Sequence, residues 1–312
     1  MVYDTPQAAK AFLKEGSAIC MGNYDGFHFG HQAILENLLK NAKAKGLKSV
    51  LLTFYPHPVK VLAPDVAPNL IYTKEQKIEI LSRTGLDCVI FHPFDRDFAK
   101  TKPEDFFTKT IIKMLKAKYI TVGYDFTFGK KRTGTTETLE SLAHENEVGI
   151  KIIKAKLQDN MLVSSSIIRK TVREANIPLS SKLLTRTFFL DGSIIQGHQR
   201  GTSLGIHTAN LDTKNELIPP DGVYATTIRL GKKTYPSVTN IGFNPTFENK
   251  ERSIETHILD FDETIYEKTV RLYFIHKLRD EIKFATPTAL VKQINKDIEA
   301  AKEYHKKHKI KE

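Results

Sequence analysis

Residues 21–32, which read MGNYDGFHFGHQ, decide the fold of the first half of the chain. They follow a short apolar run at Ser17 to Met21 and precede apolar side chains at helical spacing: Ile34, Leu35, Leu38, Leu39 and Ala42. Gly46 is the expected end of that helix. Free N–H groups and the dipole at a helix N-terminus favour bound anions. The stretch therefore predicts a phosphate site between a strand and a helix.

A second phosphate-handling signature, GTSLGIHTAN, lies beyond the middle of the chain at residues 201–210. It has no comparable helix after it, so we expect it in a different architecture. Two signatures of different kinds predict two active sites.

Strands and helices alternate in the first half of the chain. Short apolar or β-branched runs occur at residues 17–21, 49–54, 88–91, 119–123 and 150–155, most of them separated by helical pattern. This predicts a parallel, doubly wound α/β sheet, whose ligands bind beyond the carboxyl ends of the strands. The turns at Gly22 and Gly123 both fall at such ends.

The pattern changes near Thr185. Strand-like runs at residues 187–190, 223–229, 253–261 and 269–277 are separated by turn signals such as 219–222 and 230–232. We expect a small antiparallel barrel, closed by a helix with Thr286 as N-cap and Pro287 at its first position. The tail after Tyr304 is expected to fray. Because 312 residues suffice for two cores, the predicted domains are 1–184 and 185–312.

Composition favours a soluble cytoplasmic protein. Hydrophobic residues make up 40% of the chain, and no apolar run approaches the roughly 18 residues of a membrane helix. The start shows no cationic segment followed by an apolar core, so a secretory signal is not expected. Cys20 and Cys88 lie in apolar runs without C-x-x-C spacing, which indicates buried, reduced thiols.

The formal net charge of +11 predicts attraction of anions, whether nucleotides or nucleic acid. The lysines are scattered rather than grouped into a stripe interleaved with aromatic residues. We therefore favour a solvated surface over a nucleic-acid footprint.

The motifs of the chain occur in a fixed order. The first half holds GNYDGFHFGHQ (22–32), TFYPHP (53–58), VGYDFTFG (122–129) with Arg132 and Gly134, and SSSIIR (164–169). The second half holds LG (204–205), TAN (208–210), PPDGVYA (219–225), NIG (240–242) and ETHILDF (255–261). This ordered set resembles the bacterial bifunctional riboflavin kinase/FAD synthetases over nearly the whole chain, whereas H-x-G-H alone would indicate only a nucleotidylyltransferase superfamily.

The resemblance implies a Rossmann-like nucleotidylyltransferase domain followed by a barrel of riboflavin-kinase type. It implies that the barrel phosphorylates riboflavin to FMN with ATP and Mg²⁺, and that the first domain converts FMN and ATP to FAD and pyrophosphate. The partners would be these small molecules, with no membrane; the sequence leaves a homo-oligomer open. Two other interpretations are an adenylyltransferase with a degenerate kinase module, and a nucleic-acid-binding protein on a nucleotidyltransferase scaffold.

His28 and His31 are the expected catalytic residues of the first site. Adenylyl transfer requires charge neutralisation on the α-phosphate and the departing pyrophosphate, without a covalent intermediate. The two histidines flank Gly30, which lets the backbone approach the phosphates. Taken alone, the pair is equally consistent with metal ligands or a structural histidine.

The resemblance adds Arg169 as a catalytic residue, together with residues that bind the nucleotide: Gly22, Asn23, Asp25, Gly30, Asp125, Ser164, Ser165 and Ser166. Hydroxyls and a guanidinium suit phosphate oxygens. The serines also fit an N-cap cluster for a helix that begins near Ile167. Asp125 also fits a simple turn, and residues 130–132 a solvated basic loop.

In the second half, Thr208 and Asn210 are the expected Mg²⁺ ligands. Residues two apart in an extended segment point the same way, and we expect no carboxylate to accompany them nearby. That suits Mg²⁺ held largely by ATP phosphates and water, although Thr and Asn also form turns. The signature also places Gly201, Leu204 and Gly205 in nucleotide binding.

Glu255 is the expected kinase base. Strand alternation puts Glu255, His257, Leu259 and Phe261 on one face, which we expect to point inward. The resemblance assigns this carboxylate to the ribityl hydroxyl of riboflavin; an exposed glutamate on an edge strand is the alternative. The kinase half departs from the family pattern at three places: Thr202 replaces a common Arg, His207 replaces the usual Pro, and Thr185-Arg186-Thr187 replaces G-R-P.

Overall fold

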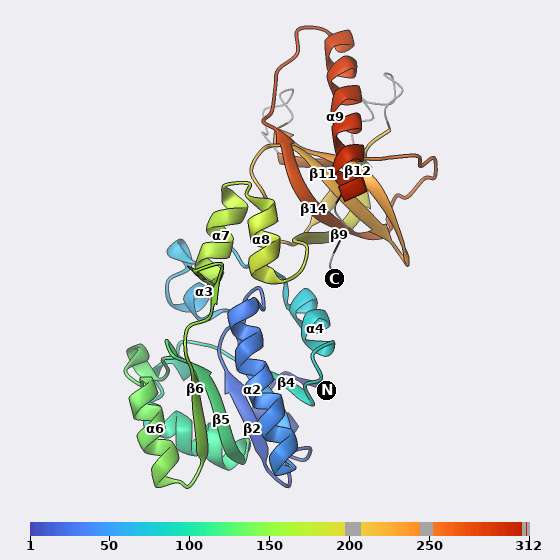
Figure 1. The fold of residues 1–312 in the computed structure, drawn as a ribbon. Coiled ribbons are helices and arrows are strands. Elements are labelled where there is room, and N and C mark those ends of the chain that lie inside the picture. Colours follow the sequence, from blue (N-terminus) through green and yellow to red (C-terminus); the bar gives the residue numbers. More distant parts are fainter. Residues whose placement is uncertain (197–206, 244–251, 308–309, 311–312) are drawn as a thin grey trace. The chain divides into compact units, whose positions relative to one another are not determined.

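The computed structural model describes residues 1–196, 207–243, 252–307 and 310, and the chain forms two compact units (Figure 1). The N-terminal unit comprises Met1–Asn69 and Lys74–Ser164. The C-terminal unit comprises Leu70–Thr73 and Ser165–Glu312. Within the described residues, no helix has the length and apolar character needed to cross a membrane.

The N-terminal unit is built on a six-stranded parallel sheet with strand order β1-β4-β3-β2-β5-β6. Its strands are β1 (Val2–Tyr3), β2 (Ser17–Met21), β3 (Lys48–Tyr55), β4 (Cys88–Pro93), β5 (Ala117–Gly123) and β6 (Gly149–Ile153). The five apolar runs of the sequence correspond to β2 through β6, so the predicted parallel α/β sheet is confirmed.

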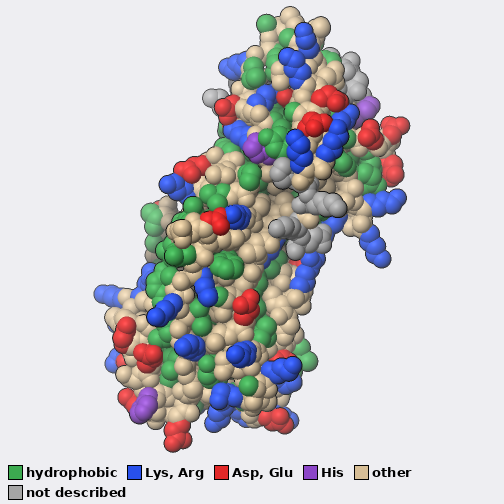
Figure 2. Space-filling view, in the orientation of Figure 1, with side chains coloured by type: hydrophobic (Ala, Val, Ile, Leu, Met, Phe, Trp, Pro, Cys, Tyr) green, Lys and Arg blue, Asp and Glu red, His purple; other side chains and the backbone are tan. Residues whose placement is uncertain are grey.

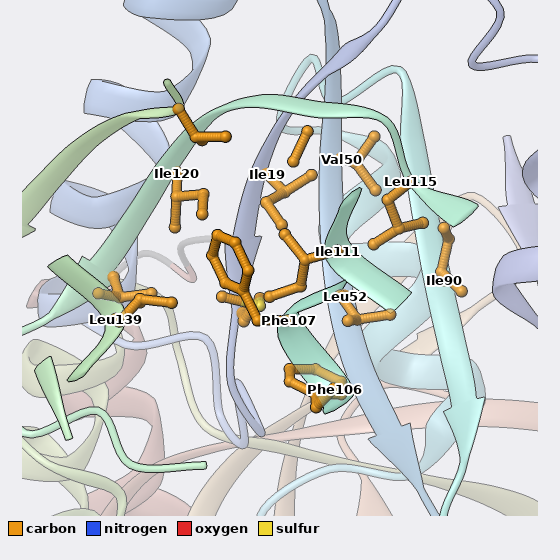
Figure 3. Close-up of a cluster of buried hydrophobic side chains, with 14 of the residues drawn as sticks. Ile19, Val50, Leu52, Ile90, Phe106, Phe107, Ile111, Leu115, Ile120 and Leu139 are labelled. Atoms are coloured by element: carbon orange, nitrogen blue, oxygen red, sulfur yellow. The ribbon is translucent and has the colours of Figure 1, made fainter. Parts of the chain in front are cut away.

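Helices cover both faces of this sheet because the side chains of β2 alternate between two cores. Ile19 and Met21 pack with Phe107 and Ile111 of the π-helical segment η3 (Phe106–Met114) and with α6 (Thr136–Glu145) (Figure 3). Ala18 and Cys20 instead face Leu38 of α2 (Phe29–Lys45) and Leu81 of α4 (Lys74–Ser82). The sheet is therefore doubly wound.

The two cysteines lie in these cores. Burial raises the pKa of both thiols, Cys20 and Cys88, to about 12. A thiol with such a pKa is almost wholly protonated at neutral pH and unreactive. The prediction of buried thiols is confirmed.

Helix α2 begins at Phe29, inside the first signature, and ends with Gly46, whose φ of 64° supplies the left-handed C-cap. The predicted end is confirmed. The other short elements of this unit are α1 (Pro6–Ala9), α3 (Pro58–Leu62), η1 (Pro64–Val66), η2 (Phe98–Lys100), α5 (Pro103–Asp105), η4 (Lys130–Arg132), β7 (Leu157–Gln158) and β8 (Met161–Leu162).

The C-terminal unit is a closed antiparallel barrel with strand order β10-β13-β12-β11-β14-β9. Its elements are α7 (Ser165–Arg173), α8 (Ile177–Leu184), β9 (Phe189–Ile195), β10 (Ala209–Thr213), β11 (Gly222–Leu230), β12 (Lys233–Phe243), β13 (Arg252–Ile258), β14 (Thr269–Arg279) and α9 (Pro287–Lys307). The predicted barrel and closing helix are both confirmed.

Hydroxyl side chains fill part of the barrel interior. Thr226 bonds Ser237 at 2.8 Å and Thr239 at 2.7 Å, and Thr239 bonds Thr256 at 2.9 Å. All four side chains are buried. Each therefore satisfies its polar group across strands, as a buried hydroxyl requires.

Helix α9 packs on the outer face of the barrel. The Thr286 hydroxyl accepts a bond from the Ala289 N–H at 3.2 Å, which confirms the predicted N-cap. The helix runs on to Lys307, because Tyr304 stacks on His276 of β14 with ring centroids 4.4 Å apart. The expected fraying after Tyr304 is therefore wrong as far as Lys307.

Two strand predictions also need correction. The first barrel strand lies at Phe189–Ile195 rather than at residues 187–190. Strand β13 ends at Ile258 and not at Phe261, because Asp260 has a φ of 51° and turns the chain.

A buried ion pair ties α9 to β14. Asp297 is 5% exposed and accepts bonds from Arg279 Nε at 3.0 Å and Nη2 at 2.8 Å. Gln293 Nε2 donates to the same carboxylate at 2.9 Å. Removing one partner of such a pair leaves the other charge buried and unbalanced.

We expect Asp297→Ala to lower the free energy of unfolding of the C-terminal unit by about 3 kcal/mol. Urea denaturation followed by circular dichroism measures this. Glu299→Ala is the matched control on the same helix, since its partner Lys302 is on the surface, and it should cost less than about 1 kcal/mol. Equal free energies of unfolding for the two variants would contradict the stabilising role of the Arg279–Asp297 ion pair.

Candidate functional site

The turn after β2 has an unusual backbone. Tyr24, Gly26 and Phe27 all have positive φ, at 47°, 82° and 42°. The carbonyl oxygen of Asn23 accepts bonds from Thr53 Oγ1 at 3.1 Å and from Lys77 Nζ at 2.7 Å. Non-glycine residues persist in this region only where their surroundings fix them. The turn is therefore held from β3 and from α4 at once.

This turn delivers the two histidines to the first turn of α2. His28 occupies the N-cap position, and its ring stacks on that of His31 with centroids 3.7 Å apart and an angle of 20°. The Tyr24 ring lies 4.6 Å from that of His31. A Cβ on Gly30 would lie 3.3 Å from the His28 ring, so glycine leaves the room that the stacked pair uses.

The location of the pair favours an anion over a cation, because the N-terminus of a helix carries partial positive charge. Within the described residues, no group of three or more His, Cys, Asp and Glu side chains is arranged to hold a metal ion. The geometry thus agrees better with phosphate binding than with the metal-pair alternative.

The two acidic candidates lie at neighbouring strand ends, since β2 pairs with β5. Asp25 is 2% exposed, and its carboxylate interacts electrostatically with Lys77. Asp125 is exposed and follows β5, where its Oδ1 lies 3.1 Å from the position of a Cβ on Gly123. Their nucleotide contacts stay predictions.

The serine and arginine motif falls at the division between the two units. Ser164 closes the N-terminal unit, whereas Ser165, Ser166 and Arg169 belong to α7 of the C-terminal unit. The helix starts at Ser165 rather than near Ile167, so Ser164 directly precedes it, as an N-cap residue would. Arg169 is buried. Both interpretations of the serines, phosphate binding and helix capping, stay open.

The N-terminal unit also contains an aromatic cavity that the sequence analysis missed. Its volume is about 330 Å³, and Asn23 of the histidine turn lies in its wall. The lining includes Phe54, Phe94, Phe98, Phe106, Phe126 and Phe128. The phenylalanines of TFYPHP and VGYDFTFG were the signal from which this cavity could have been predicted. Both motifs extend past the carboxyl ends of strands β3 and β5, where ligands of a parallel sheet bind.

Basic side chains accompany these rings. Lys131 and Arg132 of η4 line the same cavity, and Arg132 Nε donates to Thr127 Oγ1 at 2.8 Å. The cavity thus combines apolar walls with cationic groups, which suits an aromatic ligand that carries an anionic group.

In the barrel, the structure brings two separate predictions together. Asn210 of β10 lies directly opposite Glu255 of β13, and Glu255 also lies opposite Asn240 of β12. Directly opposed residues of antiparallel strands share a face and have Cβ atoms about 4.5–5.5 Å apart. The expected base is therefore next to an expected metal ligand.

The expectation that Glu255 points into the barrel is wrong. Ile254, Thr256 and Ile258 are the buried side chains of β13, and Glu255 and His257 lie on the opposite, half-buried face. The bonded hydroxyls occupy the interior near Thr256, where a carboxylate would lose its hydration. Ser253 Oγ donates to Glu255 Oε1 at 3.2 Å on the outer face.

A cavity of about 220 Å³ adjoins the metal candidates. Its lining includes Thr208, Asn210, Thr256, Phe261, Asp262 and Glu263. Asp262 and Glu263 follow β13, far from Thr208 in the sequence. The expectation that no carboxylate lies nearby is therefore wrong in space, and along the chain Asp212 lies only two residues after Asn210.

His207 also has a contact that the sequence did not predict. Its carbonyl oxygen lies 2.8 Å from Nδ1 of His257, which comes from β13. This bond holds the backbone just ahead of Thr208, where the family pattern has proline. The candidates Gly201, Leu204 and Gly205, with Thr202, lie outside the described residues.

Comparisons with known proteins match both halves. The family model described as FAD synthetase matches residues 11–167, and the one described as riboflavin kinase matches residues 184–305. A relative from Buchnera aphidicola (subsp. Schizaphis graminum) is 33% identical over 94% of this chain and 95% of its own. The Escherichia coli K12 relative is 31% identical over 93% of each chain, and the Bacillus subtilis relative 33% over 92%. All three are named bifunctional riboflavin kinase/FMN adenylyltransferase.

A solved structure also resembles the whole chain. It is described as a macrolide-efflux protein from Streptococcus pneumoniae, with a TM-score of 0.83 and 29% sequence identity. The match covers 92% of this chain and 94% of that one. Both units thus occur together in a chain of similar length.

Proposed function

The chain belongs to the bifunctional riboflavin kinase/FMN adenylyltransferase family, and we propose that it catalyses both reactions of that name. Residues 185–312 would phosphorylate riboflavin to FMN with ATP. Residues 1–184 would transfer an adenylyl group from ATP to FMN, giving FAD and pyrophosphate. The observation that carries the proposal is that each unit holds its own pair of adjacent candidate residues, the stacked His28 and His31 in one and Glu255 beside Asn210 in the other.

For adenylyl transfer, a phosphate oxygen of FMN attacks the α-phosphorus of ATP, and the bond to pyrophosphate breaks. Charge grows on the α-phosphate oxygens and on the leaving group. His28, His31 and the N–H groups that open α2 are positioned to neutralise it without forming a covalent bond. The resemblance also assigns Arg169 and the serines at residues 164–166 to phosphate binding, a role that stays a prediction.

The aromatic cavity supports FMN as the acceptor of this reaction. Its phenylalanine rings suit the flat isoalloxazine, and Lys131 and Arg132 suit the phosphate of FMN. Asn23 connects the cavity to the histidine turn, so flavin and nucleotide would meet at the carboxyl ends of β2 and β3.

For the kinase reaction, Glu255 would accept the proton of the ribityl hydroxyl. The hydroxyl oxygen then attacks the γ-phosphorus of ATP, the bond to the β-phosphate breaks and ADP leaves. Thr208 and Asn210 offer the neutral oxygens, and Asp262 and Glu263 the carboxylates, that Mg²⁺ prefers. When bound, Mg²⁺ would neutralise the charge of the ATP phosphates.

The adjacency of Glu255 and Asn210 favours an intact kinase over a degenerate module. Figure 2 gives no support to a nucleic-acid-binding surface, because Lys and Arg side chains on the face shown are dispersed among acidic ones. Since ATP and flavins are water-soluble metabolites, we expect the enzyme in the cytoplasm.

We expect His31→Ala to impair FAD formation from FMN and to spare FMN formation from riboflavin, because its imidazole serves only the N-terminal unit. Chromatographic separation of the flavins after incubation with Mg-ATP measures both. Equal loss of the two activities in a folded variant would argue against separate sites.

Glu255→Gln keeps the shape of the side chain but cannot accept a proton. General-base catalysis contributes roughly 10²–10⁴-fold, so FMN formation should fall by about that factor while FAD formation from supplied FMN continues. A variant that phosphorylates riboflavin at the wild-type rate would make Glu255 structural, with proton loss occurring late in a loose transition state.

His207→Pro should leave the kinase active or improve it. The carbonyl oxygen that bonds His257 remains, and the ring of proline restricts the backbone ahead of Thr208. Initial rates of FMN formation measure the effect. If a well-folded variant loses kinase activity, the His207 side chain or its N–H has a role of its own.

A further inference from the structure

Lys77 is a half-buried lysine whose ammonium contacts the histidine turn. It lies in α4, where Ile78 and Leu81 pack into the core shared with β3 and β4 and so fix the helix. Its Nζ donates to the Asn23 carbonyl at 2.7 Å. Neither the signatures nor the resemblance drew attention to this residue.

The same ammonium balances a buried charge. Asp25 is 2% exposed and lies two residues after Asn23 in the turn. Burial lowers the pKa of Lys77, whereas the Asp25 carboxylate raises it and so favours the charged form. A buried carboxylate without a nearby cation is costly, so this pairing helps to keep Asp25 in place.

The turn needs such support because its backbone is strained. Tyr24 and Phe27 have positive φ, and non-glycine residues stay in this region only where the surrounding structure holds them there. Thr53 supplies one neutral bond to the Asn23 carbonyl, and Lys77 supplies a second, charge-assisted one. His28 directly follows this turn and His31 lies in the first turn of α2, so the conformation of the turn sets the positions of both rings.

We propose that Lys77 is a positioning residue for adenylyl transfer: its ammonium holds Asn23 and Asp25 and thereby sets the stacked histidines against the phosphates of ATP. The proposal rests on the proposed function of the N-terminal unit. Because Lys77 acts through the turn, its loss should lower kcat of FAD formation more than it changes the KM for FMN. A misplacement of about 1 Å at a catalytic group can cost about 10²-fold in rate.

The test compares Lys77→Met with Lys74→Met in the full-length protein. Lys74 lies one turn earlier in α4, and its ammonium pairs with Asp4 at 2.7 Å and lies over the rings of Tyr55 and Phe91. For Lys77→Met, kcat for FAD formation should fall about 10- to 100-fold with the KM for FMN within about twofold. Lys74→Met should stay near wild type, and both should form FMN from riboflavin normally.

Lys77→Arg separates positioning from simple packing. It keeps the charge and a donor, so kcat should exceed that of Lys77→Met by about tenfold, although neither side chain reproduces the native fit. If thermal unfolding shows that Lys77→Met does not fold, Lys77→Gln, which keeps a donor and loses the charge, takes its place.

The outcomes separate the two claims. If folded Lys77→Met forms FAD with the kcat of Lys74→Met, or Lys77→Arg is no better than Lys77→Met, the positioning role is wrong while the proposed function stands. If the wild-type protein forms no FAD from FMN and Mg-ATP, the proposed function of the N-terminal unit itself fails.

Discussion

The carbonyl oxygen of Asn23 is the point on which the geometry of the N-terminal site depends. Bonds from Thr53 on β3 and Lys77 on α4 meet there, at the carboxyl end of β2. They fix a turn with positive φ that sets the start of α2, and with it the stacked rings of His28 and His31. A parallel sheet brings such turns to one edge, which is why the aromatic cavity opens beside the same residue.

The C-terminal unit positions its candidate residues on a closed barrel rather than at the edge of an open sheet. Hydroxyls that bond one another across strands fill part of its interior, and Glu255 lies on the outer face. Strand register, rather than sequence proximity, then brings Glu255 beside Asn210. The carboxylates of Asp262 and Glu263 line the cavity beside Asn210, because the chain turns after β13 ends at Ile258.

Periodicity was enough to predict the parallel sheet, the barrel, the closing helix and its N-cap, because each follows from local spacing and capping chemistry. It could not predict that Glu255 faces outward, since alternation defines two faces without saying which one the barrel encloses. Periodicity also did not predict the contacts of Lys77 or the phenylalanine-lined cavity. Their partners lie far away in the sequence, and only the order of the strands brings them together.

The central claim is that two complete and separate active sites share one chain. Mixing the His31→Ala and Glu255→Gln variants tests it most directly, with riboflavin and Mg-ATP as the only substrates. Each variant alone should yield almost no FAD, whereas the mixture should form it, because FMN released by one variant is the substrate of the other. A mixture of folded variants that forms no FAD, although the wild type does, would contradict the account.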